Sequence, residues 1–165
     1  MKNLVIMTAL VLSLLFAAAC AKEGRQASAT SSKPEFRHDA NLQIEDASGA
    51  LRAEFRIEIA KTEREVMDGL KNREQMDPDH GMLFIFEHLD YHSFWMQDTY
   101  LSLDMIFINH ENEVVHIEEN TTPFSEDPIF PSRPNLYVLE VLAGTVQRLN
   151  IKESDIVKWQ TLEDL

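Results

Sequence analysis

The strongest constraint on the fold is a strict alternation of apolar and charged residues between positions 51 and 59. Apolar side chains stand at every second position there, and arginine or glutamate occupies the positions between them. Because successive side chains of a β-strand point to opposite faces, this period predicts a strand with one buried and one solvent-exposed face. The turn-like residues 46–49 and the preceding residues 42–45 predict a hairpin with a partner strand.

Several later segments have the composition of short strands. They are apolar runs rich in aromatic and β-branched side chains, with polar or turn-like residues between them. Since no helical pattern alternates with them, we expect a mainly β fold: an antiparallel sandwich or barrel-like domain of seven or eight strands with one or two short helices. The predicted strands cover residues 82–86, 93–96, 105–108, 114–117, 136–142 and 156–159.

Two short helices are predicted within this pattern. Thr62 and Glu65 have the spacing of a capping box, in which each side chain binds the backbone N–H of the other residue. An apolar face with Val66 and Leu70 follows, and Gly144 opens a second, single helical turn. Between the two, four prolines in residues 121–135 predict a long loop, and long loops in compact domains are often functional.

The first twenty residues predict an exported protein. A lysine at position 2 precedes an apolar stretch that is too short for a membrane span and ends in three alanines. Cys20 follows directly and resembles the lipobox cysteine of bacterial lipoproteins, which is acylated on sulfur and becomes the N-terminus. We therefore predict a signal peptide at residues 1–19, a lipidated Cys20 and flexible tether at residues 20–35, and one domain at residues 36–165.

Lipidation and charge define the expected surroundings of the domain. Acyl chains on Cys20 would make the lipid bilayer a partner of the protein. Because Ala21 is not the aspartate that retains lipoproteins in the inner membrane, the resemblance implies an outer-membrane location facing the periplasm in a Gram-negative cell. The chain carries 15 basic and 28 acidic residues, a net charge of −13. This charge argues against a nucleic-acid partner, since such binding relies on clustered Lys and Arg.

A set of motifs resembles a prokaryotic family. Gly81-Met-Leu-Phe84 and Phe94-Trp-Met96 are its most specific segments, and their order and spacing are similar to domain-of-unknown-function family 192 over about residues 42–158. The resemblance implies a mainly β, sandwich-like fold with a helix near its N-terminal side, in proteins that are often exported or lipid-anchored, and it implies no particular activity. The other matching positions are Arg64, Gly69-Leu70, Arg73, Phe86, Thr99, Leu103-Asp104, Phe107, Leu139-Glu140 and Gly144.

Six residues form the predicted functional site. Asp104 lies within an apolar run, where a carboxylate is costly unless it is paired, and we expect Arg64 or Arg73 to pair with Asp104 or Glu140. Such pairs could line a pocket with a tryptophan floor for a small carboxylated, phosphorylated or sugar ligand. They could equally be structural and only pin the helix to the sheet. The site residues are Arg64, Arg73, Trp95, Thr99, Asp104 and Glu140.

The sequence leaves three functions open. The leading hypothesis is a binding or accessory module with a small-molecule or envelope-protein partner. The alternatives are an envelope enzyme that uses Asp104 or Glu140 as acid or base and a purely structural domain. No nucleophile or cofactor motif is recognisable, so we predict no cofactor. We also predict no metal site, because Asp77-Pro-Asp79-His80 resembles a calcium loop but lacks the later acidic ligands.

Overall fold

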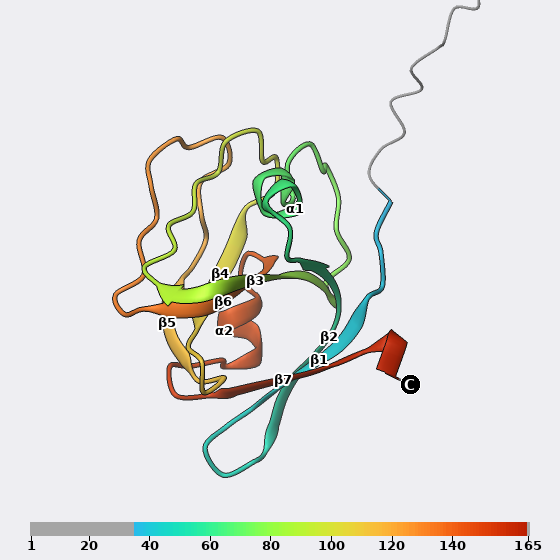
Figure 1. Ribbon diagram of the computed structural model, residues 1–165, viewed down its shortest axis with the longest axis vertical. Coiled ribbons are helices and arrows are strands. Elements are labelled where there is room, and N and C mark those ends of the chain that lie inside the picture. The colour runs from blue at the N-terminus through green and yellow to red at the C-terminus, as the bar shows by residue number, and fades with distance from the viewer. Residues whose placement is uncertain (1–34, 165) are drawn as a thin grey trace, which may run out of the picture. The chain divides into compact units, whose positions relative to one another are not determined.

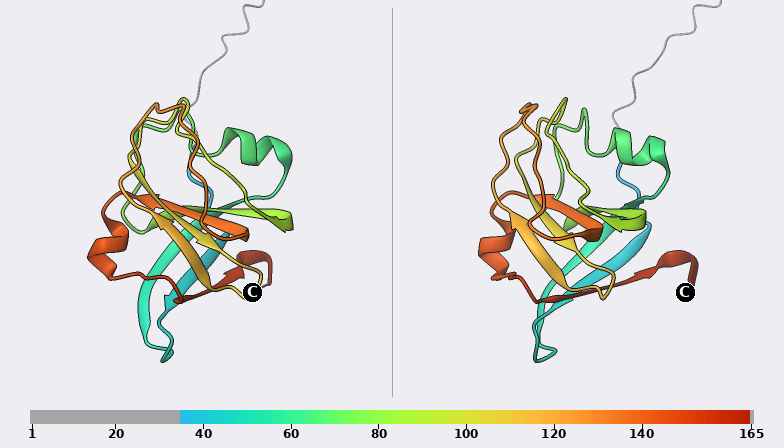
Figure 2. Two further views of the ribbon diagram at one scale, coloured as in Figure 1. Left: turned by 90° about the vertical axis from the view of Figure 1, so that its left-hand side faces the viewer. Right: turned by 60° about the vertical axis from the view of Figure 1, so that its left-hand side comes forward.

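The domain is built on a single seven-stranded sheet with the strand order β5-β4-β6-β3-β2-β1-β7. The computed structural model describes residues 35–164; the predicted signal peptide, Cys20 and nearly all of the predicted tether lie outside the described residues. Helices α1 (Glu63–Asp68) and α2 (Thr145–Leu149) lie on opposite sides of the central strands (Figures 1 and 2). The strands are β1 (Ala40–Glu45), β2 (Leu51–Ala60), β3 (His80–Asp90), β4 (Leu103–Ile108), β5 (Val114–Glu118), β6 (Asn135–Leu142) and β7 (Ile156–Thr161), and a 3₁₀ turn covers Leu162–Asp164.

The predicted fold class is confirmed: the domain is mainly β, with seven strands and two short helices. Over the described residues the sheet does not close into a barrel, and the fold is sandwich-like. The sheet is mostly antiparallel, as expected: β2 and β3 run parallel, and the other neighbouring strands are antiparallel. Parallel strands need a long crossover connection, and residues 61–79, which contain α1, supply it.

Two apolar clusters pack against opposite faces of the central strands β4 and β6. Ile106 and Leu139 belong to the first cluster, together with apolar side chains of β1, β2 and α2. Phe107 and Val138 belong to the second, which also takes in Leu70 after α1 and residues of the segment before β4. All six residues of β4 are therefore buried, which explains why this strand appears in the sequence as a continuous apolar run rather than an alternation.

The predicted strand at residues 93–96 is wrong. Phe94 forms an isolated bridge with Ile129, and Met96 donates its backbone N–H to Ser125 over 2.9 Å. Since proline has no backbone N–H, the proline-rich segment cannot continue a ladder of hydrogen bonds. The loops after β3 and after β5 therefore lie side by side as irregular segments, at the same end of the domain as α1 (Figure 1).

The predicted capping box at the start of α1 is confirmed. The Thr62 side chain accepts a hydrogen bond from the Glu65 N–H, and Glu65 Oε2 accepts one from the Thr62 N–H over 2.9 Å. The backbone hydrogen bond from Thr62, followed by one from Lys61, lowers the pKa of Glu65 to about 2. None of the helices among residues 35–164 has the length and apolar character needed to span a membrane.

Candidate functional site

A cavity of about 700 Å³ lies between α1, the end of β3 and the segment that leads from β3 to β4. Three of the six predicted site residues line it, namely Trp95, Thr99 and Glu140. Its volume falls in the range of small-molecule pockets, about 300–1,000 Å³. Most of its rings come from two short segments of chain; the aromatic lining residues are Phe84, Phe86, Tyr91, His92, Phe94 and Trp95.

Glu140 is the chemically unusual group of this cavity. It lies on β6 opposite Met82 and Met105, and only 5% of its surface is exposed. No hydrogen bond or ion pair links its carboxyl group to any other described side chain or backbone group. Burial raises the pKa of Glu140 to about 8, because a low-dielectric environment disfavours the charged form. At neutral pH the cavity therefore holds a largely protonated carboxyl group.

A glycine allows β6 to lie close against β3 at this position. A Cβ atom on Gly81 would lie 2.9 Å from the backbone oxygen of Glu140, which is too close for any residue with a side chain. The second glycine near the cavity, Gly69, ends α1 with a positive φ of 46°, and a Cβ there would contact the ring of Phe84. The two glycines thus set how closely the cavity walls approach each other.

Trp95 and Lys71 form the more exposed side of the cavity. The Lys71 ammonium group lies 5.7 Å from the centre of the Trp95 ring, within the range of a cation–π contact. Deeper in, Phe86 stacks on the His92 ring at 3.7 Å, and Phe84 meets Phe94 edge to face at 5.0 Å. These ring contacts hold the aromatic lining in place without a ligand.

Asp104 lies away from this cavity and has a structural position. It is fully buried on β4. Its Oδ1 accepts a hydrogen bond from the Asn120 N–H and its Oδ2 one from the Val146 N–H, both over 2.9 Å. Val146 lies in the first turn of α2, whose N-cap Gly144 offers no side-chain acceptor. The carboxylate of Asp104 therefore satisfies the backbone of α2 and of the segment after β5.

Neither arginine of the predicted site contacts Asp104 or Glu140, so the expected ion pairs are absent among the described residues. Arg73 instead forms a bidentate ion pair with Glu58, with Nη2 and Oε2 2.8 Å apart. Both side chains are almost fully buried. Arg64 lies exposed on α1, where its nearest partner is Asp68 at 3.5 Å, four residues along the helix. The structure thus divides the six predicted residues into three that share the cavity and three that do not.

Sequence reasoning missed several residues of the cavity. Lys71, Phe84, Phe86 and His92 were not among the predicted site residues, although Phe84 and Phe86 were recognised as family motif positions. The aromatic runs were assigned to core strands, because a strand pattern does not distinguish rings that pack in a core from rings that line a cavity. The sequence signal that was available is that two aromatic runs, residues 84–86 and 91–95, lie close together along the chain.

Comparison with known proteins gives one family. The model of the family DUF192, described as "Uncharacterized ACR", matches residues 43–159. The chain is similar to a "putative transcription regulator" from Sinorhizobium meliloti 1021, with 37% identity and a TM-score of 0.72 over 78% of this chain and 98% of that chain. It is also similar to a protein of unknown function from Novosphingobium aromaticivorans DSM 12444, with 35% identity and a TM-score of 0.68 over 72% of this chain and 84% of that chain. No curated protein matches the chain. The family match covers most of the described domain and agrees with the motifs in the sequence; the chain belongs to the domain-of-unknown-function family 192.

Proposed function

We propose that this protein is a lipid-anchored module of the cell envelope that binds a small organic cation in the cavity lined by Trp95, Thr99 and Glu140. One observation carries the proposal: a buried carboxyl group without a partner among the described residues lines a cavity whose other walls are largely aromatic. A carboxyl group left unpaired in such a place costs stability. A ligand that supplies the missing partner would recover that cost on binding.

The charges around the cavity favour a cation over an anion. The carboxylates of Glu63 and Asp68 line it, against the single ammonium group of Lys71, and Glu140 adds a further negative charge when it ionises on binding a cation. The net charge of the chain is −13, which adds a long-range attraction for cations. Aromatic ring faces also attract cations through their quadrupoles. The carboxylated or phosphorylated ligand considered from the sequence is therefore disfavoured, since its arginine partners lie elsewhere.

Glu140 gives the proposal a signature that depends on pH. An ammonium group beside the carboxyl favours its ionised form and so lowers its pKa. Because the pKa of Glu140 in the ligand-free protein is about 8, a cation that binds beside it at pH 7 must displace its proton. Affinity therefore rises as the pH increases toward 8, and binding below that pH releases a proton to the buffer.

The experiment is a calorimetric titration with two probes of the same shape. Choline carries a quaternary ammonium group, and 3,3-dimethylbutan-1-ol has carbon in place of its nitrogen. We use residues 32–165, which form one compact unit; the Sinorhizobium chain, matched over 98% of its length, shows that a chain with little beyond this domain folds. We expect choline to bind at least tenfold more tightly than the alcohol, and Glu140→Gln to remove that preference. Equal affinities for the two probes would contradict the proposal.

The envelope part of the proposal rests on the first twenty residues of the sequence. An apolar stretch before Cys20, with three alanines next to it, is typical of lipoprotein signals. Replacing Cys20 by Ser should move the protein from the membrane fraction to the soluble fraction of the cell. Unchanged membrane association of the Cys20→Ser variant would contradict lipid anchoring while leaving the cavity proposal untouched.

A second candidate function is favoured by the raised pKa of Glu140. A carboxyl group that stays protonated near neutral pH has the property required of a general acid, and the envelope enzyme considered from the sequence would use it. The two functions differ in what Glu140→Gln does. A binding module loses its preference for a cation, whereas an enzyme retains substrate affinity and loses turnover.

A further inference from the structure

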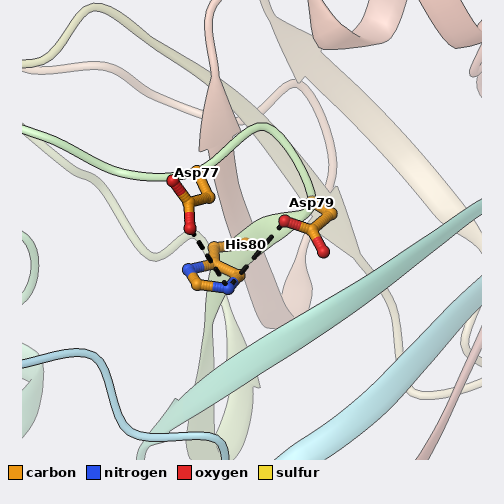
Figure 3. A group of neighbouring side chains, drawn as sticks. All are labelled: Asp77, Asp79 and His80. Carbon is orange, nitrogen blue, oxygen red and sulfur yellow. Dashed lines mark ion pairs between the residues drawn. The ribbon is translucent and has the colours of Figure 1, made fainter.

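A second cluster of possible ligand atoms lies at the start of β3 and contributes nothing to the cavity. Figure 3 shows the carboxylates of Asp77 and Asp79 reaching toward His80 from two sides. Asp77 Oδ2 lies 4.0 Å and Asp79 Oδ1 3.8 Å from His80 Nε2. The three ligand atoms all lie within 4.8 Å of one another, yet none of these separations is short enough for a hydrogen bond.

The imidazole of His80 is the unusual member of the cluster. Its side chain is 10% exposed, and Nε2 is fully buried without a hydrogen-bond partner in the described part of the chain. A buried nitrogen without a hydrogen-bond partner destabilises the folded protein. The ring is fixed in this orientation by Phe36, which stacks on it at 3.6 Å. The backbone N–H of His80 donates to the backbone oxygen of Asp77 and holds the main chain at this point.

We propose that Asp77, Asp79 and His80 bind a divalent transition-metal ion of the zinc type. Bonds of about 2.0–2.2 Å from a metal to nitrogen and oxygen place neighbouring ligand atoms about 3–3.5 Å apart. The two separations from His80 Nε2, 4.0 and 3.8 Å, exceed this by up to about 1 Å, and all three atoms lie within 4.8 Å of one another. Asp77 is 73% exposed, so its side chain is free to rotate inward onto an ion held by the fixed ring. Asp79 is 54% exposed and already directs Oδ1 at the ring.

The ligand types select the metal. One imidazole with two carboxylates suits zinc and its neighbours in the first transition row better than calcium or magnesium, which prefer oxygen ligands throughout. Three protein ligands leave at least one coordination position open to water or to a further ligand.

Arg56 prepares Asp79 for this role. Its guanidinium group binds Asp79 Oδ2 through Nη2 at 2.8 Å and Nε at 3.2 Å, which leaves Oδ1 directed at His80. The positive charge of Arg56 lowers the affinity for a cation, which makes a moderate rather than a very tight site the expected result.

The test is a calorimetric titration of residues 32–165 with Zn²⁺ alone; this unit lacks Cys20 and its thiol. We expect one ion per chain, with affinity at least tenfold lower in both Asp77→Asn and His80→Gln. His110→Gln and Asp127→Asn, at exposed positions outside the cluster, should stay within twofold of the unmodified protein. Equal affinity in all variants, which means an adventitious ion only, overturns the proposal, as does the absence of binding.

The ring nitrogens of His80 can be observed directly in the unmodified protein, so this second test does not depend on whether a variant folds. In ¹⁵N spectra of the unmodified protein, one equivalent of Zn²⁺ should shift the Nε2 resonance of His80 and leave those of His110 in place. A His80 resonance that stays unchanged while zinc binds elsewhere overturns the assignment.

Discussion

The guanidinium group of Arg73 and the carboxylate of Glu58 face each other as a buried, two-bonded ion pair between β2 and the segment that follows α1. Glu58 retains 2% of its side-chain exposure and Arg73 10%. Glu58 belongs to the charged positions of the alternating run in β2, which the sequence pattern places in solvent. It is buried because the parallel crossover brings Arg73 over it. This pair fixes the crossover segment to β2. The same segment contains α1, which forms one wall of the cavity.

Breaking this pair from one side should be strongly destabilising. Glu58→Ala leaves the guanidinium of Arg73 buried without its partner, and we expect a loss of about 3–5 kcal/mol in the free energy of unfolding. Urea unfolding measures it. Arg64→Gln removes the exposed arginine of α1 and should change stability by less than about 0.5 kcal/mol. Similar small losses in both variants would contradict a structural role for the Arg73–Glu58 pair.

Asp104→Asn should also lower stability rather than abolish ligand binding. An amide nitrogen in place of one carboxylate oxygen faces a backbone N–H, of either Asn120 or Val146, and loses that hydrogen bond. Hydrogen bonds to charged groups contribute about 1.5–3 kcal/mol, so we expect a loss of this size in urea unfolding, with choline affinity within twofold of the unmodified protein. Unchanged stability combined with lost binding would instead place Asp104 in the binding site.

Glu140 should make the protein less stable as the pH rises. Its pKa is about 8 in the folded state against 4.5 for the free group, so between these values the unfolded chain is ionised while the folded chain keeps its proton. Stability is then lost at up to about 1.4 kcal/mol per pH unit from pH 4.5 to 8 and is constant above it.

The Glu140→Gln variant separates the contribution of Glu140 to the pH dependence of stability from the contributions of other titrating groups. The glutamine side chain in this variant cannot ionise, so the free energy of unfolding of Glu140→Gln, relative to that of the unmodified protein, should rise between pH 4.5 and 8. At pH 9 the variant should be more stable by on the order of several kcal/mol. Parallel pH profiles for the two proteins would show that Glu140 is ionised in the folded state.

The capping box of α1 predicts the opposite pH dependence. The pKa of Glu65 is lowered to about 2 in the folded state, so its stabilising effect is present above pH 4.5 and is lost as the pH falls toward 2. Glu65→Ala should cost about 1 kcal/mol at pH 7 and close to nothing at pH 2. Glu63→Ala, in the same turn but outside the capping box, serves as the control; an equal cost at pH 7 would argue against the cap.

Local rules were sufficient to predict much of the fold. Alternation defined β2, the spacing of Thr62 and Glu65 defined the start of α1, and continuous apolar runs located β4 and β6. Each of these signals acts within a few residues of the chain. The run at 93–96 failed because its pairing partner is a proline-rich loop, and nothing within the run itself records that partner.

The candidate site was harder to predict because it depends on contacts between distant segments. Sequence reasoning selected Glu140 and Trp95, but it gave Glu140 an arginine partner, whereas the structure places Glu140 at a cavity lined largely by aromatic residues. Glu58 was not predicted to be buried, because its partner Arg73 is brought to it by the crossover segment and not by residues near Glu58 in the sequence. The cluster at His80 was set aside for its lack of later acidic ligands, whereas the structure shows that His80 Nε2 is buried without a hydrogen-bond partner among the described residues.

The most direct test of the central claim is the titration of the Glu140 side-chain carboxyl, followed by ¹³C NMR with and without choline. The account predicts a pKa near 8 in the free protein, and at least one pH unit lower at saturating choline, with no change when 3,3-dimethylbutan-1-ol is added instead. A pKa of Glu140 near 4.5 in the free protein, or a pKa that choline leaves unchanged, would contradict the claim that Glu140 is a buried carboxyl group that pairs with a bound cation.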